Sequence, residues 1–399
     1  MKAVPQIYLD VTSACQSPLN TGVRRMQRAL HDWLSLQHSY TPVYWQSIRC
    51  DYRRIVVEDR NILERVSSPN LRGLALYDSF LPVHLPDLWH AGRDASLSLG
   101  WQRGWKEEDI VLVPDLLWDN RGTFFKKAGE TPARLVGVFH DAIGLRRPGQ
   151  SRIDAALCAR GVKALASFDL VLCISREAEE DLHFFWKKFG LKPTITHVAP
   201  WPVPFPGKQP EHQPHFQARE LLYVARLEKH KNHMPLLEAC ELLWREGRQF
   251  RLRLIGCNAY PVYSRRVRKR VQALQGDGRD LTLQAHVSEE ALHAAYRQCS
   301  FTVFPSLLEG FGLPVIESLW HGRPVVCGSN GALGEIAESG GCERVDTRDT
   351  QSLAAAIRLL LEDENHYKKL YEEIRNRSFR SWSSYWDNVM TVINRIRKN

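Results

Sequence analysis

The chain has 399 residues, 44% of them hydrophobic and 25% charged, which is enough for two or three domains with buried cores. No apolar run approaches the ~18 residues of a membrane-spanning helix, and nine scattered cysteines without a C-x-x-C pair indicate reduced thiols in a cytosolic compartment. The net charge of +9, spread over both halves, suits an anionic partner such as a nucleotide, a sugar phosphate, an acidic lipid or nucleic acid.

The first half of the chain alternates short apolar runs with helical segments. QIYLDV, IVLVPD, RLVGVFHD and LVLCIS predict strands, and the first of them is not a signal peptide because Pro5 and Asp10 interrupt it. Between the first two strands, apolar residues recur at helical spacing: Val23, Met26, Leu30 and Trp33. Near-continuous apolar strands alternating with helices predict a parallel sheet covered on both faces, and so a Rossmann-like domain over residues 1–200.

The second half repeats this pattern after a proline-rich segment. Six prolines fall in PWPVPFPGKQPEHQP, which predicts a stiff linker over 201–214 because proline fixes φ and lacks an N–H. LLYVAR, FRLRLIG, LTLQAHV, FTVFPS and PVVCG then predict the strands of a second Rossmann-like domain over 215–380. The end of the chain, 381–399, predicts an amphipathic helix. The fold class is therefore α/β, with two doubly wound domains.

Two candidate sites fall in the first domain, each after a predicted strand. Gly22 opens the first helix and would let a substrate approach the backbone; the alternative is an ordinary helix start. His140 and Asp141 end a strand, where a histidine can bind a sugar hydroxyl or handle a proton. The alternative for this pair is a structural His–Asp contact.

Two further candidate sites follow strands of the second domain. Arg226 and Lys231 lie between LLYVAR and the next helix, where two cations can neutralise a diphosphate; the alternative is solvated surface. In EGFGLPVIE, glycine N–H groups and a helix N-terminus suit a phosphate at the carboxyl end of a strand. Glu317 can accept hydrogen bonds from a vicinal diol, and Glu309 would point beyond the phosphates. The alternative is a glycine loop with two solvated glutamates.

Several common motifs are absent from the sequence. It contains no G-x-x-x-x-G-K-[ST], no H-E-x-x-H, no G-x-S-x-G and no G-x-G-x-x-G. No D-x-D occurs that would hold a divalent metal on a nucleotide. We therefore expect no metal site and no cofactor.

Together these motifs resemble the retaining glycosyltransferases of family 4, whose GT-B fold has two facing Rossmann-like domains. EGFGLPVIE with SLWHGRPVV resembles the E-x₇-E element of that family, YVARLEKHKN its Arg…Lys motif, and GSNGALGEIA the element that follows. HDAIGLRRP resembles bacterial O-antigen and exopolysaccharide mannosyltransferases, and LDVT…NTGVRRMQRAL their glycine loop. RSFRSWSSYW resembles the C-terminal segment that crosses back onto the first domain.

The resemblance implies a role for each candidate residue. Arg226 and Lys231 would hold the diphosphate, Glu317 the ribose, and Glu309 and His140 the transferred sugar. The remaining donor-binding positions would be Gly22, Asp141, Gly256, Val287, Gly310, Phe311, Gly312 and Leu313, with the base near Gly256 and Val287. Ala225 stands where the family often has glycine, which leaves the base open.

The implied activity is metal-independent transfer of a hexose from a nucleoside diphosphate sugar, with retention of the anomeric configuration. GDP-mannose is the first donor to consider. The acceptor would be a glycan or polyprenyl-diphosphate-linked oligosaccharide of bacterial surface polysaccharide synthesis. The enzyme would be cytoplasmic. LHFFWKKFGLK (182–192) mixes aromatic residues and lysines, which suits contact with the anionic inner membrane; the alternative is a half-buried helix with a lysine rim. A nucleotide-sugar epimerase on the same fold is one alternative. A basic nucleic-acid-binding protein is another, because of RRVRKRVQALQ (265–275), although no nucleic-acid module surrounds that run.

Overall fold

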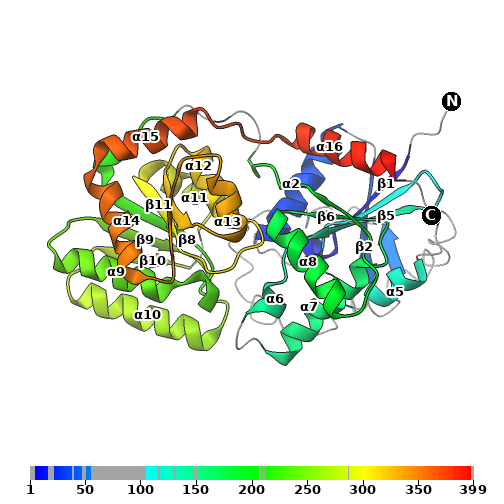
Figure 1. The fold of residues 1–399 in the computed structure, drawn as a ribbon, viewed down its shortest axis with the longest axis horizontal. Coiled ribbons are helices and arrows are strands. Elements are labelled where there is room, and N and C mark those ends of the chain that lie inside the picture. The colour runs from blue at the N-terminus through cyan, green and yellow to red at the C-terminus, as the bar shows by residue number, and fades with distance from the viewer. Residues whose placement is uncertain are drawn as a thin grey trace. The chain divides into compact units, whose positions relative to one another are not determined.

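The computed structural model describes most of the chain and divides it into two compact units. The described residues are 5–16, 22–37, 40–46, 51–54, 105–115, 117, 119, 121–128, 132–147, 151–205, 209, 212–285 and 287–396. The first unit comprises Met1–Pro204 with Arg380–Asn399, and the second comprises Phe205–Phe379. Each unit is built on its own sheet, labelled by its strands in Figure 1.

The sheet of the first unit has the strand order β3-β2-β1-β4-β5-β6-β7. All neighbouring strands are parallel except β2 and β3, which are antiparallel. The central strands β1, β4 and β6 are buried along their whole length, as their continuous apolar runs predict. The strands are β1 (Ile7–Asp10), β2 (Tyr40–Gln46), β3 (Asp51–Arg54), β4 (Ile110–Val113), β5 (Arg134–Phe139), β6 (Leu170–Cys173) and β7 (Ile195–Val198).

The helices of the first unit include one from the C-terminal end of the chain. They are α1 (Thr12–Gln16), α2 (Gly22–Gln37), α5 (Arg121–Ala128), α6 (Ile143–Arg146), α7 (Arg152–Leu165), α8 (Arg176–Lys188) and α16 (Trp382–Arg395). Helix α16 packs on this unit through Trp386, whose ring lies 5.9 Å from that of Trp33, and through Asn388, which bonds His197 at 2.8 Å. The predicted return of the C-terminal helix to the first domain is confirmed.

The proline-rich segment is anchored rather than loose where the structure describes it. Trp201 is buried in the first unit and stacks on Tyr385 of α16, with ring centroids 5.3 Å apart. Phe205 is buried in the second unit, 4.5 Å from the ring of His293. Prolines exclude regular structure here, as expected, and the two aromatic side chains between them supply packing that composition does not reveal.

The sheet of the second unit is wholly parallel, with the order β10-β9-β8-β11-β12-β13. Successive strands run outward from β8 on one side and from β11 on the other, so the strand order reverses between these two neighbours. In doubly wound folds this reversal opens a crevice at the carboxyl ends of the strands, where ligands bind. The strands are β8 (Glu220–Val224), β9 (Arg251–Ile255), β10 (Leu281–Gln284), β11 (Phe301–Phe304), β12 (Val325–Gly328) and β13 (Cys342–Val345).

Helices cover both faces of this sheet. In Figure 1, α9, α10 and α14 lie on one side and α11, α12 and α13 on the other. The elements are η2 (Phe216–Ala218), η3 (Lys229–Lys231), α9 (His233–Arg245), α10 (Pro261–Gly276), α11 (Glu289–Gln298), α12 (Leu313–Trp320), α13 (Gly331–Ala337), α14 (Thr350–Glu362) and α15 (Glu364–Arg375). The helix predicted after EGFG is therefore present as α12, with Pro314 in its first turn.

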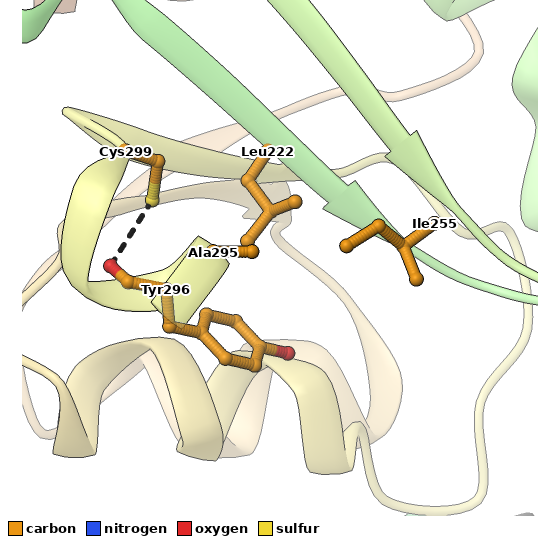
Figure 2. Packing of buried hydrophobic residues seen from close by; sticks show 5 residues of the cluster. All are labelled: Leu222, Ile255, Ala295, Tyr296 and Cys299. Atoms are coloured by element: carbon orange, nitrogen blue, oxygen red, sulfur yellow. Dashed lines mark hydrogen bonds between the residues drawn. The ribbon is translucent and has the colours of Figure 1, made fainter. Parts of the chain in front are cut away.

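A compact apolar cluster holds α11 against the sheet. Figure 2 shows its members: Leu222 of β8, Ile255 of β9, and Ala295, Tyr296 and Cys299 of α11 and its end. Val224, Val287 and Leu292 pack against it from outside. The cluster packs α11 against β8 and β9, the two strands whose following loops contain Arg226, Lys231 and Gly256.

Candidate functional site

The candidate residues of the second unit meet where the strand order reverses. The loop after β8 and the loop after β11 are joined by a hydrogen bond from the Leu307 N–H to the His230 carbonyl, 2.8 Å long. Across the same junction, Lys231 Nζ lies 2.5 Å from Glu309 Oε1. Two residues that are 78 positions apart in sequence therefore form one charged pair at the expected crevice.

The Lys231–Glu309 pair is largely shielded from solvent. The side chains are 17% and 9% exposed, and Nζ also lies 5.7 Å from the centre of the Phe304 ring. The Tyr223 hydroxyl donates to the Lys231 carbonyl and fixes the backbone. An ammonium group has three donors, so one bond to Glu309 leaves Lys231 able to bind a further anion.

Arg226 lies in the same loop and is half exposed. Its side chain is 48% exposed, and Nη1 lies 3.1 Å from Glu228 Oε1. The other oxygen of Glu228 lies 3.4 Å from His230 Nδ1. Glu228, which the sequence did not single out, thus links Arg226 to His230 within the β8–α9 loop. The guanidinium keeps most of its five donors for a ligand.

Gly256 has a clear backbone reason for being glycine. An added Cβ would lie 1.7 Å from the Ala225 carbonyl oxygen, so the loops after β8 and β9 approach too closely for any side chain. The Leu227 N–H donates to the Cys257 carbonyl at 2.9 Å and holds the loops together. Of the two predicted base-binding positions, Val287 packs against the apolar cluster, and Gly256 directly follows its member Ile255 in the chain.

The glycine loop before α12 is fixed by its backbone conformation. Gly312 is the residue at the N-terminus of α12 and has φ +102°, a region that favours glycine. A Cβ there would also come within 2.7 Å of the Leu333 side chain. Gly310, Phe311 and Leu313 surround it at the start of the helix, where backbone N–H groups favour an anion.

Glu317 lies deeper than its sequence position indicated. The residue is 1% exposed, and its Oε2 accepts a hydrogen bond of 2.9 Å from the Tyr296 hydroxyl. The alternative of two solvated glutamates is wrong, because both carboxylates are held by partners inside the protein. Tyr296 is a residue of this site that the sequence analysis missed.

His140 of the first unit is buried at the carboxyl end of β5. Its Nε2 donates to the Pro114 carbonyl at 3.2 Å, and its ring stacks on Trp201 at 6.1 Å. Burial lowers the pKa of His140 to about 4, despite the carbonyl bond and the nearby Asp115, so the ring is neutral at pH 7. A neutral imidazole in this setting can hydrogen-bond a hydroxyl without bringing charge.

The other two candidates of the first unit have simple local roles. Asp141 Oδ1 accepts a hydrogen bond of 2.9 Å from the Ile143 N–H at the start of α6. Gly22 is the first residue of α2 and is exposed. Asp141 and Gly22 therefore both lie at the start of a helix, which the sequence predicted for Gly22.

A buried charged network at the first unit's own strand reversal was not expected. Arg121 donates to Asp10 at 2.5 Å, to Asp115 at 2.6 Å and to Asp119 at 2.9 Å. The Tyr52 hydroxyl adds a bond of 2.6 Å to Asp10. Burial raises the pKa of Asp10, an effect that the Arg121 charge opposes. Asp10, Tyr52 and Arg121 come from segments far apart in the chain, so no local sequence pattern predicts that they form one network.

Comparison with known proteins places the second unit in a class. Residues 208–377 match the family described as "Glycosyl transferases group 1". The serotype-specific mannosyltransferase WbdA of Escherichia coli is 23% identical over 361 residues, 84% of this chain and 39% of that protein. The O-antigen chain mannosyltransferase B of Escherichia coli is 33% identical over 147 residues, 36% of this chain and 37% of that protein. Residues 208–377 thus resemble a glycosyl transferases group 1 domain, and the chain spans well under half the length of these relatives.

Solved structures agree with this class at the level of the fold. Sucrose-phosphate synthase from Thermosynechococcus elongatus aligns over 98% of both chains with a TM-score of 0.67 and 19% identity. Anabaena Alr3699/HepE, crystallised with UDP and glucose, aligns over 98% of this chain and 100% of that one, with a TM-score of 0.62 and 13% identity. The predicted α/β fold of GT-B type, with two Rossmann-like domains, is confirmed.

Within the described residues, no helix is long and apolar enough to cross a bilayer. The same part of the chain contains no group of three or more His, Cys, Asp or Glu side chains placed to hold a metal ion.

Proposed function

We propose that the protein is a glycosyltransferase of family 4 that moves a hexose from a nucleoside diphosphate sugar to a glycan or polyprenyl-diphosphate-linked acceptor. The observation that carries the proposal is the Lys231–Glu309 pair, 2.5 Å apart, at the strand reversal of a glycosyl transferases group 1 domain. The cation and the helix N-terminus at this strand reversal suit the diphosphate of such a donor, and the Glu309 carboxylate suits its sugar.

The leaving diphosphate would be stabilised by the chain's own cations. When the bond from C1 to the diphosphate oxygen breaks, the nucleoside diphosphate leaves with the electron pair and its charge grows. Arg226, Lys231 and the backbone N–H groups at Gly312 and Leu313 would bind that charge. Because these groups supply the electrostatic role that a divalent cation takes elsewhere, we propose that transfer needs no metal.

The sugar would be held by Glu309, whose carboxylate can accept hydrogen bonds from its hydroxyl groups. The acceptor hydroxyl would attack C1 from the face that the diphosphate leaves, so the new bond keeps the configuration of the old one. Its proton would pass to an oxygen of the departing diphosphate. Retention and metal independence are tested together by determining the anomeric configuration of the product in buffer containing EDTA.

The donor is best sought among mannose nucleotides. Both curated relatives described above are mannosyltransferases, which supports GDP-mannose, whereas the Anabaena neighbour was crystallised with UDP and glucose. The O-antigen relative supports an acceptor in bacterial surface polysaccharide synthesis. Thermal-shift measurements with GDP, UDP, dTDP and ADP identify the base, because a ligand of the native state raises the melting temperature. We expect the largest rise with GDP; no rise with any of the four would contradict the proposal.

We also propose that this cytoplasmic enzyme contacts the anionic inner membrane through the end of α8. Phe184 is 59% exposed there, beside the exposed Lys187 and Lys188, and Ile195 of the neighbouring β7 is 49% exposed. Exposed apolar side chains among lysines suit an anionic lipid surface. Phe184→Ser with Lys187→Glu should reduce sedimentation with phosphatidylglycerol vesicles. Arg265→Glu with Arg266→Glu, on α10, provides a charge-reversal control.

A further inference from the structure

Tyr296 connects the apolar cluster of the second unit to the buried carboxylate of Glu317. Its side chain is fully buried, and it belongs to the cluster that packs α11 against β8 and β9 (Figure 2). Its hydroxyl donates to Glu317 Oε2 at 2.9 Å. The two residues are 21 positions apart and belong to α11 and α12, so this bond joins two helices at the edge of the candidate site.

The ring of Tyr296 is held in place from a second side. It stacks on His321, with centroids 5.4 Å apart and planes 12° apart. His321 Nε2 lies 3.0 Å from His293 Nδ1, and the ring of Phe205 lies 5.4 Å from His321. Burial lowers the pKa of His321 to about 3, so this stack is uncharged at pH 7. The tyrosine therefore has little freedom to move its hydroxyl away from Glu317.

We infer that Tyr296 is a positioning residue that fixes the Glu317 carboxylate for the vicinal diol of the nucleotide ribose. The hydroxyl is a neutral donor, so it orients the carboxylate without cancelling its charge. Fixing one oxygen of a carboxylate sets the orientation of its plane, and a pair of neighbouring hydroxyls binds best to a carboxylate whose orientation is already set. This inference rests on the proposed function, because it assumes a nucleotide donor at Glu317.

The test compares the binding of ribose and dideoxyribose nucleotides to the 399-residue chain. GDP and UDP, each beside its 2′,3′-dideoxy counterpart, are titrated by calorimetry into wild type and Tyr296→Phe. Wild type should bind the better ribonucleotide at least about tenfold more tightly than its dideoxy form. Tyr296→Phe should lose about fivefold in affinity for the ribonucleotide, the effect of one hydrogen bond, and less than about twofold for the dideoxy form.

A matched variant separates positioning from stability. Tyr367 is also fully buried in the second unit, and its hydroxyl donates to the Ser300 carbonyl at 2.7 Å. Tyr367→Phe removes a buried hydroxyl of the same kind and should leave the ribose preference unchanged. In turnover, Tyr296→Phe should raise the donor KM while kcat stays within about twofold.

The outcomes distinguish this inference from the function on which it rests. Equal losses for ribose and dideoxyribose ligands in Tyr296→Phe, or no loss for either, would overturn the positioning role alone. If wild type binds the ribose and dideoxyribose nucleotides equally well, and Glu317→Gln does the same, Glu317 does not bind the diol either. Absence of binding by either nucleotide pair would overturn the proposed function and this inference together.

Discussion

Each of the two sheets reverses its strand order once, between β1 and β4 in the first unit and between β8 and β11 in the second. The charged residues at these two reversals differ in exposure and in how many partners they already have. Between β8 and β11 the charged groups are partly exposed, with Arg226 at 48% and Lys231 at 17%, and they retain donors for a ligand. Between β1 and β4, Arg121 is 3% exposed and is bonded to three carboxylates inside the protein. The same topology thus produces a candidate binding site in one unit and an internal charged network in the other. What differs is whether the bonding capacity of the charges is already used.

The largest expected effect comes from breaking the internal network. Arg121→Met leaves the buried Asp10 and Asp115 without their cation, which should cost about 3–5 kcal/mol of unfolding free energy. Urea unfolding of the variant at pH 7 measures this loss. Nucleotide binding by the second unit should survive under conditions where the variant remains folded. A loss below about 1 kcal/mol would show that the network is not structural.

Acidification should reveal the buried neutral histidine of the first unit. The folded pKa of His140 is lowered to about 4 from 6.5, so the unfolded chain binds the proton more readily, and stability falls as pH decreases from 6.5 towards 4. Between pH 6.5 and 5, protonation of His140 in the unfolded chain should lower the unfolding free energy by about 2 kcal/mol. Urea unfolding at pH 7 and pH 5 should therefore give a smaller difference for His140→Asn than for wild type. Identical differences would contradict the neutral, buried assignment.

The two candidate cations of the second unit, Arg226 and Lys231, should matter for activity. Arg226→Ala and Lys231→Ala should each lower turnover by at least about tenfold, or ~1.4 kcal/mol, because each removes a charge from the leaving diphosphate. The unfolding free energy of Arg226→Ala should stay within about 1 kcal/mol of wild type, because this side chain is half exposed. Arg245 is the control: it is 66% exposed and paired with Glu241 on α9, so Arg245→Ala loses a cation outside the site. Near-normal turnover in both site variants would remove the diphosphate assignment.

The sequence predicted those parts of the fold whose signal is local. Apolar runs identified β1, β4, β5, β6, β8, β11 and β12, because strands buried on both faces need apolar residues at nearly every position. The alternating leucines of RLRLI and LTLQ identified β9 and β10, whose polar positions are at least partly exposed. It missed β2, β3, β7 and β13. YTPVYWQ and ITHV mix polar and apolar residues, and β3 and β7 stand at the edges of their sheet, where one side lacks a neighbour.

The same distinction holds for the candidate site. Arg226, Lys231 and Glu309 could be predicted because βα loops at the carboxyl ends of neighbouring strands must meet. Tyr296, Glu228 and Trp201 could not, since each acts through a contact that depends on packing rather than on a local motif. Glu317 is likewise buried because Tyr296 of α11 packs against it. The spacing of residues within EGFGLPVIE carries no information about where α11 lies.

Calorimetric titration of a nucleoside diphosphate into wild type and Lys231→Ala tests the central claim most directly. If the crevice between β8 and β11 holds a diphosphate, GDP or another of the four nucleotides should bind wild type and bind Lys231→Ala at least about tenfold more weakly. Equal affinity in the two proteins, or no heat of binding with any of the four, would contradict it.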